Sequence, residues 1–171
     1  MDPIIEVGRS APDFSLPDLD GQSHRLSDYL GKIVLINFWS AECPWAERAD
    51  KNLVPKLHHW GEGVVLLTIA SNVNEPIEML KPSAVERGLE LVLVDEGYQI
   101  ADLYQAQTTP HFFVIDAQGT LRYMGAYDDV TFRQRIPVHC YVCEAVEALL
   151  AGKGPHITQA PPYGCTIVRG R

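Results

Sequence analysis

The sequence predicts an α/β fold in which a central mixed sheet is covered by helices on both faces. Four continuously apolar runs are rich in β-branched residues, as central strands covered on both faces should be. Helical patterns separate the first three runs, and such alternation makes the strands that it connects parallel. The four runs are residues 33–39, 64–70, 91–94 and 112–115. A fifth run, residues 121–126, follows a glycine-containing turn and adds an antiparallel hairpin.

The remaining elements follow from turn and helix signals along the chain. Residues 1–31 form an irregular lead-in with a hairpin turn at Asp20-Gly21 and a short helical turn capped near Ser27 and Asp28. Apolar residues at helical spacing, proline starts and glycine stops indicate four helices. The helices cover residues 44–60, 75–87, 98–104 and 142–150. An irregular, proline-rich tail occupies residues 153–171, and we predict a single domain over residues 1–171.

Composition and charge exclude several classes of function. The chain is 46% apolar and 21% charged, as soluble globular proteins are. Its net charge of −8 and the lack of a Lys/Arg cluster argue against nucleic acid or an anionic membrane surface as a partner. No apolar run approaches the ~18 residues that span a bilayer, and the first ten residues do not resemble a secretory signal. A cytoplasmic location and no membrane contact are therefore predicted.

Cys43 lies where the first buried strand meets the first helix. In open α/β sheets such strand-to-helix junctions bind ligands. Pro44 suits the first helical turn, which places Cys43 at or near the N-cap. Unpaired backbone N–H groups and the helix dipole favour a thiolate there, while the neighbouring carboxylate of Glu42 disfavours it. We expect a pKa for Cys43 that is lowered but not extreme.

Three segments carry a family resemblance. Residues 11–44, A-P-D-F-S-L-P-D-L-D-G-Q-S-H-R-L-S-D-Y-L-G-K-I-V-L-I-N-F-W-S-A-E-C-P, resemble the redoxin branch of the thioredoxin-like superfamily, the AhpC/TSA group. Thr109-Pro110, at the opening of a buried strand, is similar to the cis-proline of that superfamily. The closing P-P-Y-G-C-T-I resembles the tail of a subgroup whose active site reads C-P-(aromatic). Together the resemblance covers residues 11–168.

The resemblance implies a thioredoxin-like fold with Cys43 as the attacking sulfur and no cofactor. Pro110, if cis, would lie against Cys43, and the backbone of Thr109 would pair with an extended peptide or hold the substrate. Two departures bear on the chemistry. Ala46, expected to be buried, replaces the second cysteine of a dithiol thioredoxin. The proline and threonine that precede a peroxidatic cysteine are replaced by Ile36 and Ser40, of which Ser40 either supplies a hydroxyl or is a solvated loop residue.

A second thiolate must resolve a mixed disulfide on Cys43, and the other three cysteines are the internal candidates. Cys165 lies on the flexible tail and belongs to the subgroup resemblance. Cys140 and Cys143 open the last helix, where helical periodicity puts Cys140 away from the apolar stripe and Cys143 on its flank. We expect both to be exposed or half exposed. Zinc binding by this C-x-x-C is disfavoured because no second pair is present.

These observations predict a cytosolic, antioxidant-type thiol oxidoreductase. Cys43 attacks a disulfide or the O–O bond of a peroxide. Cys165, or as second choices Cys143 or Cys140, then forms the disulfide that an external thiol reductant, thioredoxin or a low-molecular-weight thiol, reduces. Two alternatives stay open at this point. One is a peroxiredoxin-like peroxidase proper, and the other is a non-enzymatic redox-sensing or binding module on a thioredoxin fold.

Overall fold

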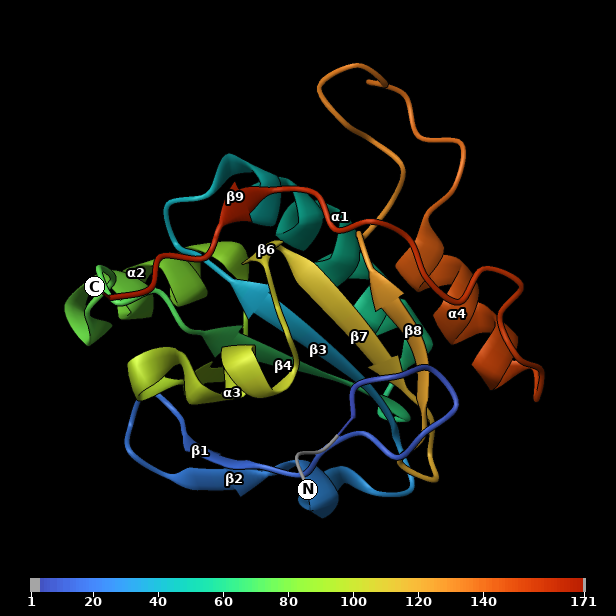
Figure 1. Ribbon diagram of the computed structural model, residues 1–171, viewed down its shortest axis with the longest axis horizontal. Helices are drawn as coiled ribbons and strands as arrows, with labels where there is room; N and C mark the ends of the chain where they lie inside the picture. Colours follow the sequence, from blue (N-terminus) through green and yellow to red (C-terminus); the bar gives the residue numbers. More distant parts are fainter. Residues whose placement is uncertain (1–3, 171) are drawn as a thin grey trace.

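A five-stranded mixed sheet forms the centre of the molecule (Figure 1). The computed structural model describes residues 4–170, so the first three residues of the predicted lead-in and Arg171 of the predicted tail lie outside the described residues. The sheet order is β5-β4-β3-β7-β8. These strands are β3 (Ile33–Trp39), β4 (Val64–Ala70), β5 (Val92–Val94), β7 (His111–Ile115) and β8 (Leu121–Gly125). Strands β3, β4 and β5 are parallel, whereas β7 is antiparallel to both of its neighbours. The predicted strands agree with these bounds to within one residue.

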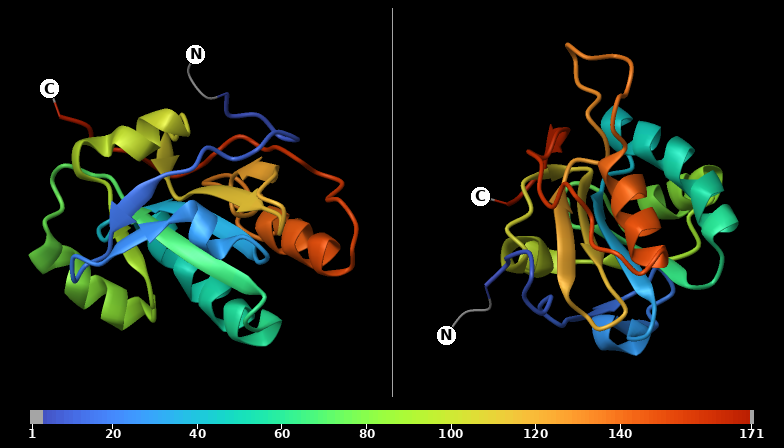
Figure 2. Two further views of the ribbon diagram at one scale, coloured as in Figure 1. Left: turned by 90° about the horizontal axis from the view of Figure 1, so that it is seen from below. Right: turned by 90° about the vertical axis from the view of Figure 1, so that its right-hand side faces the viewer.

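Helices cover both faces of the sheet, as predicted (Figure 2). On one face lie α1 (Pro44–Trp60), α2 (Ile77–Arg87) and α4 (Tyr141–Leu150). Apolar side chains of α1 and α4 meet there over β3, β7 and β8. The other face is covered by α3 (Gln99–Leu103) and by the lead-in, which bury the side chains of Val34, Ile36 and Phe38. Because both faces are covered, all seven residues of β3 are buried.

The lead-in forms the expected hairpin. Its strands are β1 (Ser15–Pro17) and β2 (Ser23–Arg25), and the 3-10 turn η1 (Leu26–Tyr29) follows. The predicted turn is present, but its N-cap is Arg25, and Ser27 and Asp28 lie inside it. The carboxylate of Asp28 accepts a hydrogen bond from the backbone N–H of Arg25. A second 3-10 turn, η2 (Glu96–Tyr98), precedes α3. Helix α2 begins two residues later than predicted because Pro76 occupies its N-cap. It ends where predicted, with Gly88 in the left-handed conformation.

The tail is more ordered than the sequence predicted. Its segment Cys165–Thr166 forms strand β9, which pairs antiparallel with β6 (Thr108–Thr109), the two residues before Pro110. Upstream, the backbone of Ala160 donates to Met124 on β8. A Cβ at Gly125 would overlap the carbonyl group of Ala160, so only glycine admits the crossing tail. Within residues 4–170, none of the helices combines the length and the apolar composition needed to cross a bilayer.

Candidate active site

Cys43 occupies the N-cap of α1. Strand β3 ends at Trp39, a short turn follows, and Cys43 is extended with Pro44 at the first helical position. The side chain is buried, with 3% of the residue exposed. The N-terminal amides of α1 are unpaired within the helix and present partial positive charge to this position. Ala46, which stands in place of a second cysteine, is fully buried as predicted.

The sulfur of Cys43 faces two segments that are distant in the sequence. Cys43 Sγ lies 3.0 Å from the carbonyl oxygen of Thr109 and 2.7 Å from Sγ of Cys165. Thr109 and Cys165 are direct partners in the β6–β9 pairing. The peptide bond from Thr109 to Pro110 is cis, as the resemblance led us to expect. Four of the predicted site residues are thus brought together at one end of the sheet.

The two facing thiols have opposite acidities. Burial raises the pKa of Cys43, but the hydrogen bond with Cys165 and the backbone N–H of Ala46 outweigh this effect and hold it below the usual range. Burial, the neighbouring sulfur of Cys43 and the carboxylate of Glu75 raise the pKa of Cys165 to about 12. Cys43 therefore ionises first, and Cys165 keeps its proton. An ionised sulfur and a protonated one therefore face each other at this site.

Glu75 joins the turn before Cys43 to the tail that carries Cys165. Its buried carboxylate accepts hydrogen bonds from the hydroxyl of Ser40, the backbone N–H of Ala41 at 2.7 Å and the side-chain amide of Asn72 at 2.8 Å. Asn72 Oδ1 in turn accepts the backbone N–H of Val168 at 2.8 Å. Ser40 is therefore neither solvated nor directed at Cys43. The expectation of a solvated loop residue is wrong, because Ser40 is buried and its hydroxyl donates a hydrogen bond to the carboxylate of Glu75.

Arg87 holds the same turn from the opposite side. Its guanidinium donates to the carbonyl oxygens of Ser40 and Ala41, and it pairs with Asp50 at 3.3 Å. The indole N–H of Trp39 donates to the same carboxylate at 2.8 Å. Burial raises the pKa of Asp50 to about 6, although Trp39 and Arg87 oppose this. Sequence reasoning missed this network, and the one available signal was a charged residue within the buried stripe of α1.

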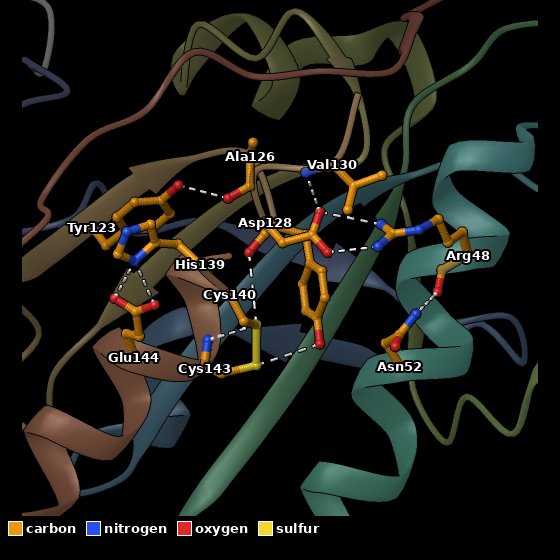
Figure 3. Close-up of a disulfide and its surroundings, with 11 residues drawn as sticks. Arg48, Asn52, Tyr123, Ala126, Asp128, Val130, His139, Cys140, Cys143 and Glu144 are labelled. Atoms are coloured by element: carbon orange, nitrogen blue, oxygen red, sulfur yellow. Dashed lines mark hydrogen bonds and ion pairs between the residues drawn. A yellow bond between two sulfur atoms is a disulfide. The ribbon is translucent and has the colours of Figure 1, made fainter. Parts of the chain in front are cut away.

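Cys140 and Cys143 are bonded to each other and not brought to Cys43 (Figure 3). Cys140 is half exposed at the N-cap of α4, but Cys143 is buried, with 5% of the residue exposed. The expectation that both are exposed or half exposed is wrong for Cys143. The reason is helical phase: Cys143 precedes Val146 by three residues and shares its apolar face.

Two further residues surround or underlie the site. Trp45 is half exposed beside Cys43, and its ring packs edge-to-face on Tyr163, with ring centroids 4.9 Å apart. Ile36 is fully buried in the apolar cluster on the α3 face, so it contributes packing and not a polar contact.

Comparison with known proteins shows the family of this chain. Residues 7–124 match the AhpC/TSA family. The chain belongs to this family. It is 36% identical over 121 residues to the thiol-disulfide oxidoreductase ResA of Geobacillus kaustophilus, a match that covers 69% of this chain and 68% of the relative. The predicted redoxin branch and the predicted class of enzyme, a thiol-disulfide oxidoreductase, are confirmed.

Solved structures extend the likeness to nearly the whole chain. An uncharacterized conserved protein from G. kaustophilus superposes with a TM-score of 0.89 at 30% identity, covering 98% of this chain and 94% of that one. A hypothetical protein from Sinorhizobium meliloti 1021 gives 0.87 at 29% identity, with 98% and 97% covered. A thioredoxin domain from Bacteroides vulgatus superposes with a TM-score of 0.61 at 24% identity, covering 69% of this chain and 86% of that one, and confirms the thioredoxin-like fold.

Proposed function

We propose that this protein exchanges thiols and disulfides through Cys43 and Cys165, with Cys43 as the nucleophile and Cys165 as the resolving thiol. The observation that carries the proposal is the 2.7 Å separation of the two sulfurs together with their opposite acidities. A disulfide bond is about 2.05 Å long, so closure of this pair requires only a small movement. No cofactor enters the reaction.

The exchange proceeds in two displacements. The thiolate of Cys43 attacks one sulfur of a substrate disulfide, forms a mixed disulfide and releases the other substrate sulfur as a thiolate. Cys165 then loses its proton to that leaving group or to solvent and attacks Sγ of Cys43. This step forms the Cys43–Cys165 disulfide and releases the second substrate thiol. An external thiol reductant, such as thioredoxin or a low-molecular-weight thiol, returns both cysteines to the reduced state.

The chain's own tail occupies the place expected for an extended substrate peptide. Strand β9 pairs with Thr109, whose backbone the family resemblance assigns to the substrate. A polypeptide substrate can pair there only when β9 has moved away, which also removes Cys165 from Cys43. We infer that substrate binding displaces β9 and that its return brings Cys165 back to resolve the mixed disulfide.

A disulfide is a better substrate for this site than a peroxide. Ile36 lies in the core and Ser40 donates to Glu75, so neither position offers a hydrogen bond to a peroxide oxygen. The facing, oppositely acidic thiols also favour chemistry over a binding module. A cytoplasmic location stays a prediction.

The test uses a background in which Cys140→Ser and Cys143→Ala leave only Cys43 and Cys165. Turnover of a peptide with one disulfide is followed by thiol release with a dithiol reductant. Addition of Cys43→Ser should abolish turnover. With the reductant omitted, addition of Cys165→Ser should trap the peptide on Cys43, visible as an increase in intact mass by one peptide chain. Normal turnover without Cys165 and without a trapped adduct would refute the assigned roles.

A further inference from the structure

The start of α4 repeats the arrangement that places Cys43. Cys140 is the N-cap of this ten-residue helix, and its sulfur accepts the backbone N–H of Cys143 at 3.3 Å. The two cysteines have C-x-x-C spacing and form a disulfide. Their exposure is unequal, since Cys140 is half exposed and Cys143 is buried. An incoming thiolate can therefore reach Cys140, while Cys143 is shielded.

Tyr127 supports the buried sulfur. Its hydroxyl lies 3.5 Å from Sγ of Cys143. A disulfide sulfur carries no proton, so the tyrosine is the donor. The ring of Tyr127 is buried against Phe112, and burial raises the pKa of its hydroxyl, which stays protonated. A thiolate that forms on Cys143 can accept a hydrogen bond from this hydroxyl, whereas the helix N–H shown at this disulfide donates to Cys140. The hydroxyl of Tyr127 therefore supports the departure of Cys143 as a thiolate.

A protruding segment, residues 131–139, leads directly to Cys140 (Figures 1 and 2). The segment exposes Phe132 at 71%, Ile136 at 80% and Val138 at 76%. It also carries Arg133 and Arg135, although the net charge of the chain is −8. Apolar side chains of this size are seldom exposed together without a partner.

The base of this segment is fixed. Asp129 accepts the backbone N–H groups of Val138 and His139 at 2.9 and 3.0 Å. The hydroxyl of Tyr163 accepts the N–H of Phe132 at 2.8 Å. The segment is therefore held beside the disulfide and presents apolar and cationic groups. An extended polypeptide with apolar and acidic residues complements this surface.

We propose that the Cys140–Cys143 disulfide is a second exchange site, which accepts electrons from the cysteine thiols of acidic, apolar polypeptides bound along residues 131–139. A substrate thiolate attacks Sγ of Cys140, the Cys140–Cys143 bond breaks, and the electron pair of that bond leaves with Cys143. A second substrate thiolate attacks the substrate sulfur of the mixed disulfide and releases Cys140. Two substrate thiols become one disulfide, and two electrons and two protons are left on Cys140 and Cys143.

The test uses the full chain with Cys43→Ser and Cys165→Ser, so that its result does not depend on the function proposed above. Two single-cysteine peptides serve as probes, identical except that one carries aspartates and the other lysines. The reaction is quenched at early times by alkylation of the free thiols, and the peptide adduct is located by mass spectrometry. We expect the adduct on Cys140 and the alkyl group on Cys143, forming about tenfold faster with the acidic peptide.

Two variants separate exchange from a purely structural disulfide. Tyr127→Phe should slow adduct formation about tenfold, because a hydrogen bond to the leaving thiolate is lost, while the circular dichroism spectrum is unchanged. Arg133→Glu with Arg135→Glu should reverse the peptide preference. A disulfide that reacts only after unfolding in denaturant, or equal adducts on both sulfurs, would overturn the site. An unchanged peptide preference in the charge-reversed variant would overturn the docking surface.

Discussion

At the scale of single residues, the site depends on a proton that two sulfurs share unequally. Cys43 has the unpaired amides of α1 beside it, whereas Cys165 lies at the edge of the site near the carboxylate of Glu75. The same 2.7 Å contact therefore lowers the pKa of Cys43 and raises that of Cys165. Each cysteine sets the acidity of the other, which couples the two thiols before any substrate arrives.

Removal of the Cys165 thiol should raise the pKa of Cys43. In Cys165→Ala the thiolate of Cys43 loses a hydrogen-bond partner, while burial still opposes its charge. The pH dependence of alkylation by iodoacetamide reports this pKa, since Cys140 and Cys143 are bonded to each other. The midpoint should move to higher pH. Thr166→Ala, on the exposed side of the same strand, is the control and should leave the midpoint in place. Identical midpoints for Cys165→Ala and the unmodified chain would contradict this coupling.

Local sequence could predict the position of Cys43 but not its supports. A strand end, a proline and a helical stripe are neighbours in the chain, so they fix the N-cap without tertiary information. Glu75 and Arg87 act on the turn from 34 or more residues away in sequence. No periodicity reveals such contacts. Asp50 is the one residue whose sequence position indicates such a contact, because a carboxylate among buried apolar residues requires a partner.

At the scale of elements, the β6–β9 pairing decides whether the two sulfurs meet. Gly164 precedes Cys165, and a Cβ there would overlap the carbonyl of Thr109. Gly164→Ala should therefore push β9 off β6 and slow closure of the Cys43–Cys165 disulfide by about tenfold or more, because the thiols lose their enforced proximity. Oxidation by a limiting disulfide reagent, quenched and followed by mass, measures the rate.

Gly170→Ala is the matched control for this prediction. A Cβ at Gly170 meets nothing within 4 Å, and the residue lies on the same tail. The closure rate should match that of the unmodified chain. If Gly164→Ala closes the disulfide as fast as Gly170→Ala, then β9 does not hold Cys165 in place.

Strands could be predicted where their signal is local in the sequence, and not where a strand depends on a distant partner. Buried strands appear as continuous apolar runs, so the bounds of β3 and β4 were predicted to the residue. Strand β9 has two residues, and its partners in β6 are distant in sequence: Thr108 pairs with Thr166, 58 positions away, and Thr109 pairs with Cys165, 56 positions away. A strand of two residues is too short to show an alternating apolar and polar pattern. Only the resemblance of the tail indicated that it returns to the site.

At the scale of the whole molecule, two buried groups in different layers act on stability in opposite directions as pH changes. His111 opens β7, and its Nδ1 accepts the backbone N–H of Gln107 at 3.2 Å. Burial lowers its pKa from 6.5 to about 4. Burial raises the pKa of Asp50, on the buried face of α1, from 3.8 to about 6. Both residues are buried, so solvent screens neither effect.

The signs follow from which state binds protons. Between pH 6.5 and about 4 the unfolded chain protonates His111 and the folded chain does not, so its contribution to stability is lost as pH falls. The folded chain protonates Asp50 at higher pH than the unfolded chain, so its contribution is largest in acid and is lost as pH rises through about 6. Each shift corresponds to about 3 kcal/mol, because one pH unit is worth about 1.4 kcal/mol. The two contributions nearly cancel between pH 4 and 6.

Single substitutions should reveal how each residue makes the free energy of unfolding depend on pH. In His111→Gln, where Asp50 alone remains, the free energy of unfolding should increase on acidification from pH 6.5 to 4 relative to the unmodified chain. In Asp50→Asn, where His111 alone remains, it should decrease over the same interval. Urea unfolding at pH 4, 5, 6 and 7 measures both, and the difference between the variants should reach several kcal/mol at pH 4 when each is referenced to its own value at pH 7. Parallel curves of unfolding free energy against pH for the three proteins would contradict the pKa shifts that burial causes at His111 and Asp50.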